Sequence, residues 1–169
     1  LVLFGDASGG REGREPALRR VSLAVALVDA RSGSVLRALF GGLAGHSQTV
    51  HRGELRALLL AVQGSAGPTL YVADNLAVCE GWWGRYDQDP HGEDADLWKL
   101  IGAEFERRSR CEFVFTHDFS HMDVEEAAAR GVDYWVVQGN AVADTIAEVA
   151  ADLVRLPAEA RGRVARVEH

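Results

Sequence analysis

The chain has 169 residues, of which 47% are hydrophobic and 25% are charged, proportions typical of one soluble globular domain with its own core. Eighteen basic side chains stand against 25 carboxylates, which gives a formal charge of −7. This balance argues against a protein that holds nucleic acid by bulk electrostatic attraction, but it does not exclude a local basic face. Lys99 is the only lysine, so any phosphate contacts would be made largely by arginine.

Simple patterns exclude several classes of protein. No apolar run approaches the roughly 20 residues that a membrane-spanning helix needs, and the N-terminus has no signal-peptide pattern. Cys79 and Cys111 lack the spacing of a zinc ribbon or a disulfide scaffold, so we expect two reduced thiols and an intracellular protein. Because the chain begins at Leu1 inside an apolar run, we expect a domain of a longer polypeptide.

The hydrophobic pattern alternates early in the chain and turns helical later. Strands are expected at residues 1–6, 21–28, 35–40, 69–73 and 112–116. Helices are expected at residues 49–63, from the fourth strand to about Gly84, at residues 97–108 and at residues 123–130, where Gly131 closes the helix. Asn140 is predicted to cap a final long helix that ends near Leu156, and the tail 157–169 is a candidate for one more helix.

This order of elements predicts an α/β domain over residues 1–156. The first three strands have short connections and are expected to form an antiparallel meander. With two further strands they would make a mixed five-stranded sheet that carries helices on both faces.

Four carboxylates stand at core-facing positions of apolar elements. Asp6 and Asp74 end predicted strands, Glu54 faces the sheet from its helix, and Asp144 falls in the expected first turn of the last helix. A buried carboxylate is costly unless an arginine or a cation compensates it. Oxygen ligands without His or Cys suit Mg²⁺ or Mn²⁺, and two such ions about 4 Å apart serve phosphodiester hydrolysis.

Each acid also has a purely structural interpretation. Asp6 could cap the glycine turn that follows it, and Glu54 could pair with Arg52. Asp74 could N-cap the next helix, and Asp144 could favour the N-terminus of its own helix.

Five segments, in order, resemble the type 1 ribonuclease H family, including the ribonuclease H domains of reverse-transcribing elements. They are FGDASG at residues 4–9, VHRGEL at 50–55, YVADN at 71–75, DLW at 96–98 and GNAVAD at 139–144. The resemblance implies the ribonuclease-H-like fold. It also implies that Asp6, Glu54, Asp74 and Asp144 hold two Mg²⁺ or Mn²⁺ ions, with Asp6 as the bridging ligand.

The resemblance further implies a catalytic His just after the last strand, and His117 occupies that place. It would aid water activation or product release, with His121 as a rival for the role. Four residues that neighbour the acids are expected to bind the substrate, because RNA is distinguished by contacts to its 2′-hydroxyl groups: Ser8, Gly9, Arg52 and Asn75. Of Trp82 and Trp83, we expect one in the core and one in the groove for the DNA strand.

Three features depart from the family pattern. His51 stands where the family has Asn, which puts one substrate contact in doubt. Residues 85–96, with one Arg and five acids, replace the basic handle of some members. Residues 118–138 form an insertion that could be a lid, a substrate-contacting arm or a docking surface, and Tyr134 and Trp135 within it are candidates for contact or for core packing.

We therefore expect a metal-dependent endoribonuclease that cleaves the RNA strand of RNA–DNA hybrids and leaves 5′-phosphate ends. Two alternatives remain from the sequence. One is a catalytically silent module of the same fold, kept for binding or for scaffolding a polyprotein, and the other is a DNA-cutting nuclease. In isolation the domain is expected to be a monomer.

Overall fold

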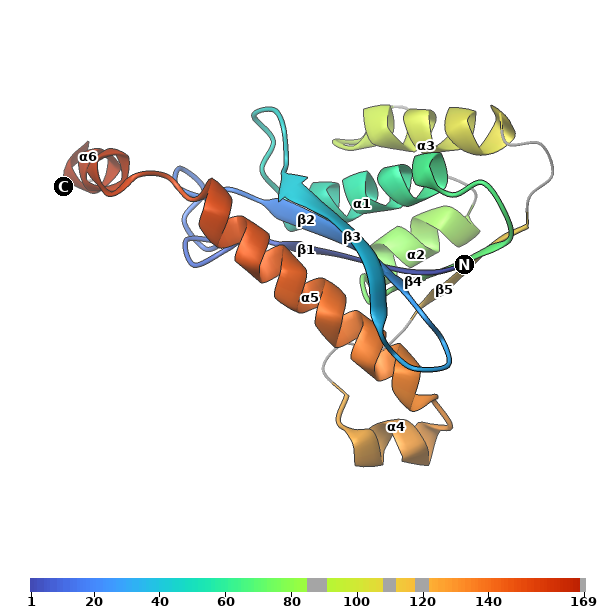
Figure 1. Ribbon diagram of the computed structural model, residues 1–169. Helices are drawn as coiled ribbons and strands as arrows, with labels where there is room; N and C mark the ends of the chain where they lie inside the picture. Colours follow the sequence, from blue (N-terminus) through green and yellow to red (C-terminus); the bar gives the residue numbers. More distant parts are fainter. Residues whose placement is uncertain (85–90, 108–111, 118–121, 168–169) are drawn as a thin grey trace.

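Five strands form one mixed sheet in the order β3-β2-β1-β4-β5 (Figure 1). The computed structural model describes residues 1–84, 91–107, 112–117 and 122–167. The strands are β1 (Val2–Ser8), β2 (Ser22–Val28), β3 (Val35–Gly42), β4 (Thr69–Ala73) and β5 (Phe113–His117). β1, β2 and β3 pair antiparallel, while β4 is parallel to β1 and β5 is parallel to β4. The predicted meander with two further strands is thus confirmed.

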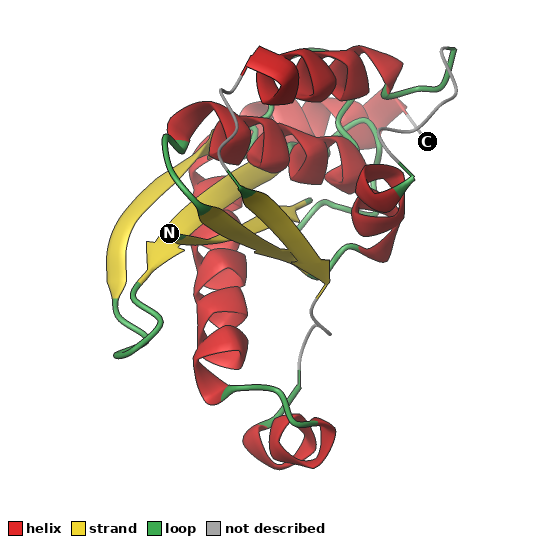
Figure 2. Cartoon of the chain, turned by 90° about the vertical axis from the view of Figure 1, so that its right-hand side faces the viewer, coloured by secondary structure: helices red, strands yellow, loops and turns green. Residues whose placement is uncertain are grey.

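Helices cover both faces of this sheet. The described helices are α1 (Val50–Gly64), α2 (Leu76–Trp83), α3 (Ala95–Arg107), α4 (Val124–Arg130), α5 (Tyr134–Val154) and α6 (Ala158–Val167). α1, α2 and α3 lie on one side, whereas α5 crosses the other side along β1, β2 and β3 (Figures 1 and 2). None of the described helices combines the length and the apolar character that a bilayer crossing requires.

Alternation along β1 divides the core into two layers. Leu3 and Ala7 pack in the cluster that includes α1, α2 and α3, whereas Phe4 packs in the cluster beneath α5. Both sides of β1 are hydrogen-bonded to neighbouring strands, which makes it the central strand of the sheet. A polar side chain near its end is therefore held on a rigid and largely buried support.

The last long helix starts earlier than the sequence predicts. α5 begins at Tyr134, with Asp133 at the N-cap position, so Asn140 is not a cap and lies buried inside the helix. Asp144 is likewise in the middle of α5 and not in its first turn. Tertiary packing explains the difference. Trp135, in the first turn of α5, meets the ring of Phe4 edge-on with 6.2 Å between the ring centroids. This contact stabilises the helix before Asn140.

In each of two neighbouring aromatic pairs, one side chain packs in the core and the other is half exposed. Trp82 packs with Phe105, Phe113 and Phe115 in the core, whereas Trp83 is half exposed. Trp135 packs on the sheet, whereas Tyr134 is half exposed.

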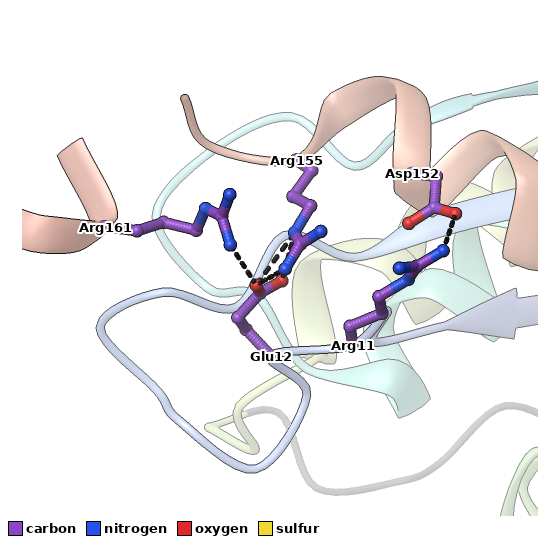
Figure 3. A network of polar contacts seen from close by, with 5 residues as sticks. All are labelled: Arg11, Glu12, Asp152, Arg155 and Arg161. Carbon is purple, nitrogen blue, oxygen red and sulfur yellow. Dashed lines mark hydrogen bonds and ion pairs between the residues drawn. The ribbon is translucent and has the colours of Figure 1, made fainter. Parts of the chain in front are cut away.

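An ion-pair network holds the tail against the loop after β1 (Figure 3). Glu12 accepts hydrogen bonds from Arg155 Nε over 2.8 Å and from Arg161 over 3.2 Å. Arg11 pairs with Asp152 over 3.1 Å. The tail does form a helix, α6, and Arg161 within it contacts Glu12 in the loop after β1.

Candidate functional site

Register brings the first two acids together. β1 and β4 run parallel, and their pairing places Phe4 beside Val72. Asp6 lies two residues beyond Phe4, and Asp74 lies two residues beyond Val72. Because parallel strands advance in the same direction, both carboxylates reach the same edge of the sheet. Asp6 is only 7% exposed there.

Glu54 joins them from α1. The first turns of α1 are pressed onto the sheet at Gly53, where an added Cβ would lie 2.7 Å from both Ala7 Cβ and Val21 Cγ1. This close approach buries Glu54 to 3% exposure. The pairing of β1 with β4 ends at Phe4, and beyond it the backbone N–H of Ala7 donates to Glu54 Oε1 over 3.1 Å. A side chain of α1 therefore bonds to the backbone of β1 beyond the point where its pairing with β4 ends.

The three carboxylates form a compact cluster. Asp6, Glu54 and Asp74 each offer an oxygen, and these oxygens all lie within 4.8 Å of one another. They open into a pocket of about 330 Å³. Its polar lining comprises Asp6, Glu54, Asp74, Asn75, Asn140 and Asp144. Asp144 therefore shares the pocket from the α5 side without belonging to the tight cluster of three.

The electrostatics of the cluster favour a cation. Burial raises the pKa of Asp6 to about 7, and the charges of Asp74 and Asp144 contribute to the rise. Burial also raises the pKa of Glu54 well above its usual range, and the charge of Asp6 adds to the rise. Glu54 Oε2 is buried and has no hydrogen-bond partner among the described residues. An all-oxygen donor set with such an unpaired oxygen fits a hard divalent ion such as Mg²⁺ or Mn²⁺.

The structural interpretations of the acids do not hold. Asn75, and not Asp74, caps α2 through its side-chain oxygen. The Ser8 hydroxyl, and not Asp6, accepts from the N–H of Gly10 in the glycine turn. Asp144 lies too far along α5 to interact with the N-terminus of that helix.

Arg52 does not neutralise Glu54 either. Its guanidinium donates to Asp94 over 2.9 Å and to Asp96 over 2.8 Å, which ties α1 to the start of α3. Among the described contacts, the buried carboxylate of Glu54 therefore has no arginine partner.

His117 stands at the edge of the cluster. It is the last residue of β5 and pairs in register with Ala73, so it lies beside the strand end that carries Asp74. Its Nε2 is 3.1 Å from the backbone oxygen of Asp74. His121, the rival for the same role, lies outside the described residues.

The predicted substrate-binding residues lie around the pocket to different degrees. Asn75 lines it directly. Ser8 ends β1 and Gly9 begins the loop that follows it, where an added Cβ at Gly9 would lie 3.5 Å from Val50 Cγ2 on the pocket wall. Arg52 has its guanidinium engaged by Asp94 and Asp96.

The sequence missed one polar residue of the pocket. The local pattern predicts a helix cap at Asn140, whereas this residue lines the pocket from the interior of α5. Its spacing of four residues from Asp144 carried a signal, since positions four apart share one face of a helix. The spacing is informative only if α5 is known to begin before Asn140, so that both residues lie within the helix.

Comparisons with known proteins agree on the fold. No protein-family model matches the sequence, and no curated protein matches it. The solved structure of LC11-RNase H1 in complex with an RNA/DNA hybrid is similar with a TM-score of 0.64 at 14% identity, covering 90% of this chain and 96% of that one. The ribonuclease H domain of prototype foamy virus gives a TM-score of 0.66 at 17% identity, with 90% and 94% covered.

A third similar structure is the foamy viral protease-reverse transcriptase in complex with an RNA/DNA hybrid. Its TM-score is 0.65 at 16% identity, and the match covers 90% of this chain but 20% of the viral one. These similarities, at low identity over nearly the whole chain, show that the chain has the ribonuclease H fold.

Proposed function

We propose that the protein is a metal-dependent endonuclease that hydrolyses the RNA strand of RNA–DNA hybrids. The observation that supports this most is the cluster of Asp6, Glu54 and Asp74 in a pocket shared with Asp144, on a ribonuclease H fold. Two of the similar structures hold an RNA/DNA hybrid, which supports this substrate, and a third, a foamy viral protease-reverse transcriptase, holds double-stranded DNA, so the assay below compares both. The fold by itself would not justify the assignment, because one fold hosts many activities.

In this proposal Asp6, Glu54, Asp74 and Asp144 would hold two Mg²⁺ or Mn²⁺ ions. When bound, the ions lower the pKa of the attacking water and stabilise the 3′ oxygen as it leaves, which yields 5′-phosphate and 3′-hydroxyl ends. The unpaired Glu54 Oε2 and the raised pKa of Asp6 support the cation site, because both groups gain from a nearby positive charge.

Other residues orient the carboxylates, move protons or bind the substrate. The N–H of Ala7 orients Glu54. His117, beside Asp74, moves a proton to or from the reacting oxygens or helps the product leave. Asn75, together with Ser8 and Gly9 at the end of β1, meets the RNA strand at its 2′-hydroxyl groups.

Arg52 would bind the hybrid only if it exchanged an acidic partner for a phosphate. Its present partners, Asp94 and Asp96, belong to the acidic segment that stands where some family members carry a basic handle. We therefore propose that the isolated domain, a monomer, binds the hybrid weakly and works within a longer polypeptide, as the foamy viral similarity suggests.

A cleavage assay tests the proposal. Labelled RNA–DNA hybrid, duplex DNA and duplex RNA are incubated with the protein in Mg²⁺, in Mn²⁺ or in EDTA. We expect cleavage of the hybrid alone, no cleavage in EDTA, and loss of cleavage in Asp74→Asn. Asp29→Asn, the same change in the turn between β2 and β3, serves as the matched control and retains activity.

Other outcomes point to the alternatives. Equal cleavage of duplex DNA identifies a DNA-cutting nuclease of the same fold. Mn²⁺ binding measured by calorimetry separates the remaining case: a folded wild-type protein that binds no Mn²⁺ and cleaves nothing is a silent binding or scaffold module.

A further inference from the structure

The side-chain oxygen of Asn140 is an unpaired polar atom in the wall of the acidic pocket. Asn140 is 7% exposed, and its Oδ1 is buried without a hydrogen-bond partner among the described residues. It lines the same pocket as the four acids and lies one helical turn before Asp144 on α5.

The position is not explained by the architecture of α5. The other buried residues of this helix are small and apolar: Gly139, Ala143, Ala147, Ala150 and Ala151. Asn140 cannot act as a helix cap, because α5 begins six residues earlier at Tyr134. A buried amide oxygen without a partner lowers the stability of the fold, so a leucine would suit this place better unless that oxygen serves a ligand.

Packing also determines where the amide lies. The preceding residue, Gly139, meets the ring of Phe4 so closely that an added Cβ would lie 2.2 Å from Phe4 Cζ. Phe4 belongs to β1, two residues before Asp6. The same contact therefore seats α5 on the strand that carries Asp6 and holds Asn140 at the pocket.

We infer that Asn140 Oδ1 belongs to the oxygen donors of the cation site, where it faces a bound ion or a water molecule of its shell. Mg²⁺ and Mn²⁺ favour oxygen donors and keep several waters, each of which needs a hydrogen-bond acceptor. An amide oxygen meets this need without adding charge. A fifth carboxylate would add its charge to those of Asp74 and Asp144, which raise the pKa of Asp6 together with burial, the larger cause.

This inference rests on the proposed function and is tested by metal binding. Mn²⁺ affinity is measured by calorimetry, and the melting temperature is measured without metal, for the wild type, Asn140→Leu, Asn140→Ala and Asn140→Asp. We expect about tenfold weaker Mn²⁺ binding in the leucine and alanine variants, as for other residues that support metal ligands. The aspartate variant keeps an acceptor oxygen, so its affinity should stay within about threefold of the wild type or exceed it.

The metal-free melting temperature separates this role from a structural one. In Asn140→Leu it should equal or exceed that of the wild type, because the unpaired amide is gone. Thr145→Val is the matched control: it removes a polar atom from the exposed side of the same helix and should leave Mn²⁺ affinity unchanged. Should the leucine variant fail to fold, the alanine variant decides the question.

Two results distinguish the possible failures. If the wild type binds Mn²⁺ and the leucine and alanine variants bind it equally well, the role of Asn140 is wrong while the proposed function stands. If the wild type itself binds no Mn²⁺, the proposed cation site is wrong.

Discussion

The backbone N–H of Ala7 donates a hydrogen bond to Glu54 Oε1 over 3.1 Å, which joins the central strand to α1 at the floor of the acidic pocket. The contact satisfies one oxygen of a carboxylate that is almost fully buried and leaves the other oxygen, Oε2, unpaired. One oxygen therefore serves the fold, and the other is available to a ligand.

This division predicts the effect of Glu54→Gln. The amide oxygen of glutamine still accepts from Ala7, and the cost of burying a charge disappears, so the metal-free melting temperature should equal or exceed that of the wild type. Cleavage of the hybrid should fall by about 100-fold or more, the scale seen when a preorganised electrostatic group is removed. Glu148→Gln, on the exposed side of α5, should change neither quantity. A variant that cleaves normally contradicts the assignment of Glu54.

The buried carboxyl of Asp6 predicts a pH dependence of stability in the metal-free protein. Its folded-state pKa is raised from 3.8 to about 7, so the folded state holds this proton more tightly than the unfolded state does. The stability that results is fully present below the unfolded pKa and is lost as the pH rises through about 7. Melting temperatures measured from pH 4 to pH 8 in metal-free buffer should therefore fall with pH.

The variant Asp6→Asn isolates this group. The melting temperature of this variant should fall less with rising pH than that of the wild type, because the titrating carboxyl is gone. Added Mn²⁺ should restore the stability of the wild type at pH 8 by binding the ionised carboxylates. An identical pH profile in both proteins contradicts the prediction.

The contact between Gly139 and Phe4 predicts that α5 tolerates no side chain at this point. In Gly139→Ala the new Cβ would lie 2.2 Å from Phe4 Cζ, so the helix or the ring must shift. We expect a loss of about 1–3 kcal/mol in the free energy of unfolding, measured by urea denaturation. Gly64→Ala, the matched change at the end of α1, meets no atom within 4 Å and should cost nothing. Equal stabilities in the two variants would show that α5 is loosely seated.

The ion pairs of Glu12 predict that α6 can be released without unfolding the sheet (Figure 3). One carboxylate binds both Arg155 and Arg161. In Glu12→Ala, amide hydrogen exchange in residues 158–167 should speed up several-fold, while exchange in β1 stays unchanged. Glu159→Ala, an exposed change on α6 itself, is the control. Unchanged exchange in α6 would show that other contacts hold it.

Local patterns were sufficient for most of the elements. The strand at Thr69–Ala73 has the predicted bounds, and Gly131 closes α4 in the left-handed conformation that favours glycine. Asn140 shows where local pattern fails. Asparagine is a strong helix-cap residue, yet the covering of Phe4 by Trp135 extends the helix through it. Burial of an aromatic surface outweighs a capping preference, and no local signal reports that burial.

The sequence by itself determined the sheet, its meander and the identity of the four acids, because alternation, helical spacing and motif order are local properties of the chain. Only the tertiary structure decided how the acids meet. The register of β1 against β4 brings Asp74 beside Asp6, and the tight packing of α1 at Gly53 buries Glu54 between them. It also engages Arg52 with Asp94 and Asp96 and turns Asn140 from a cap into a pocket residue. These relationships depend on distances between segments far apart in the chain, and those distances follow from packing.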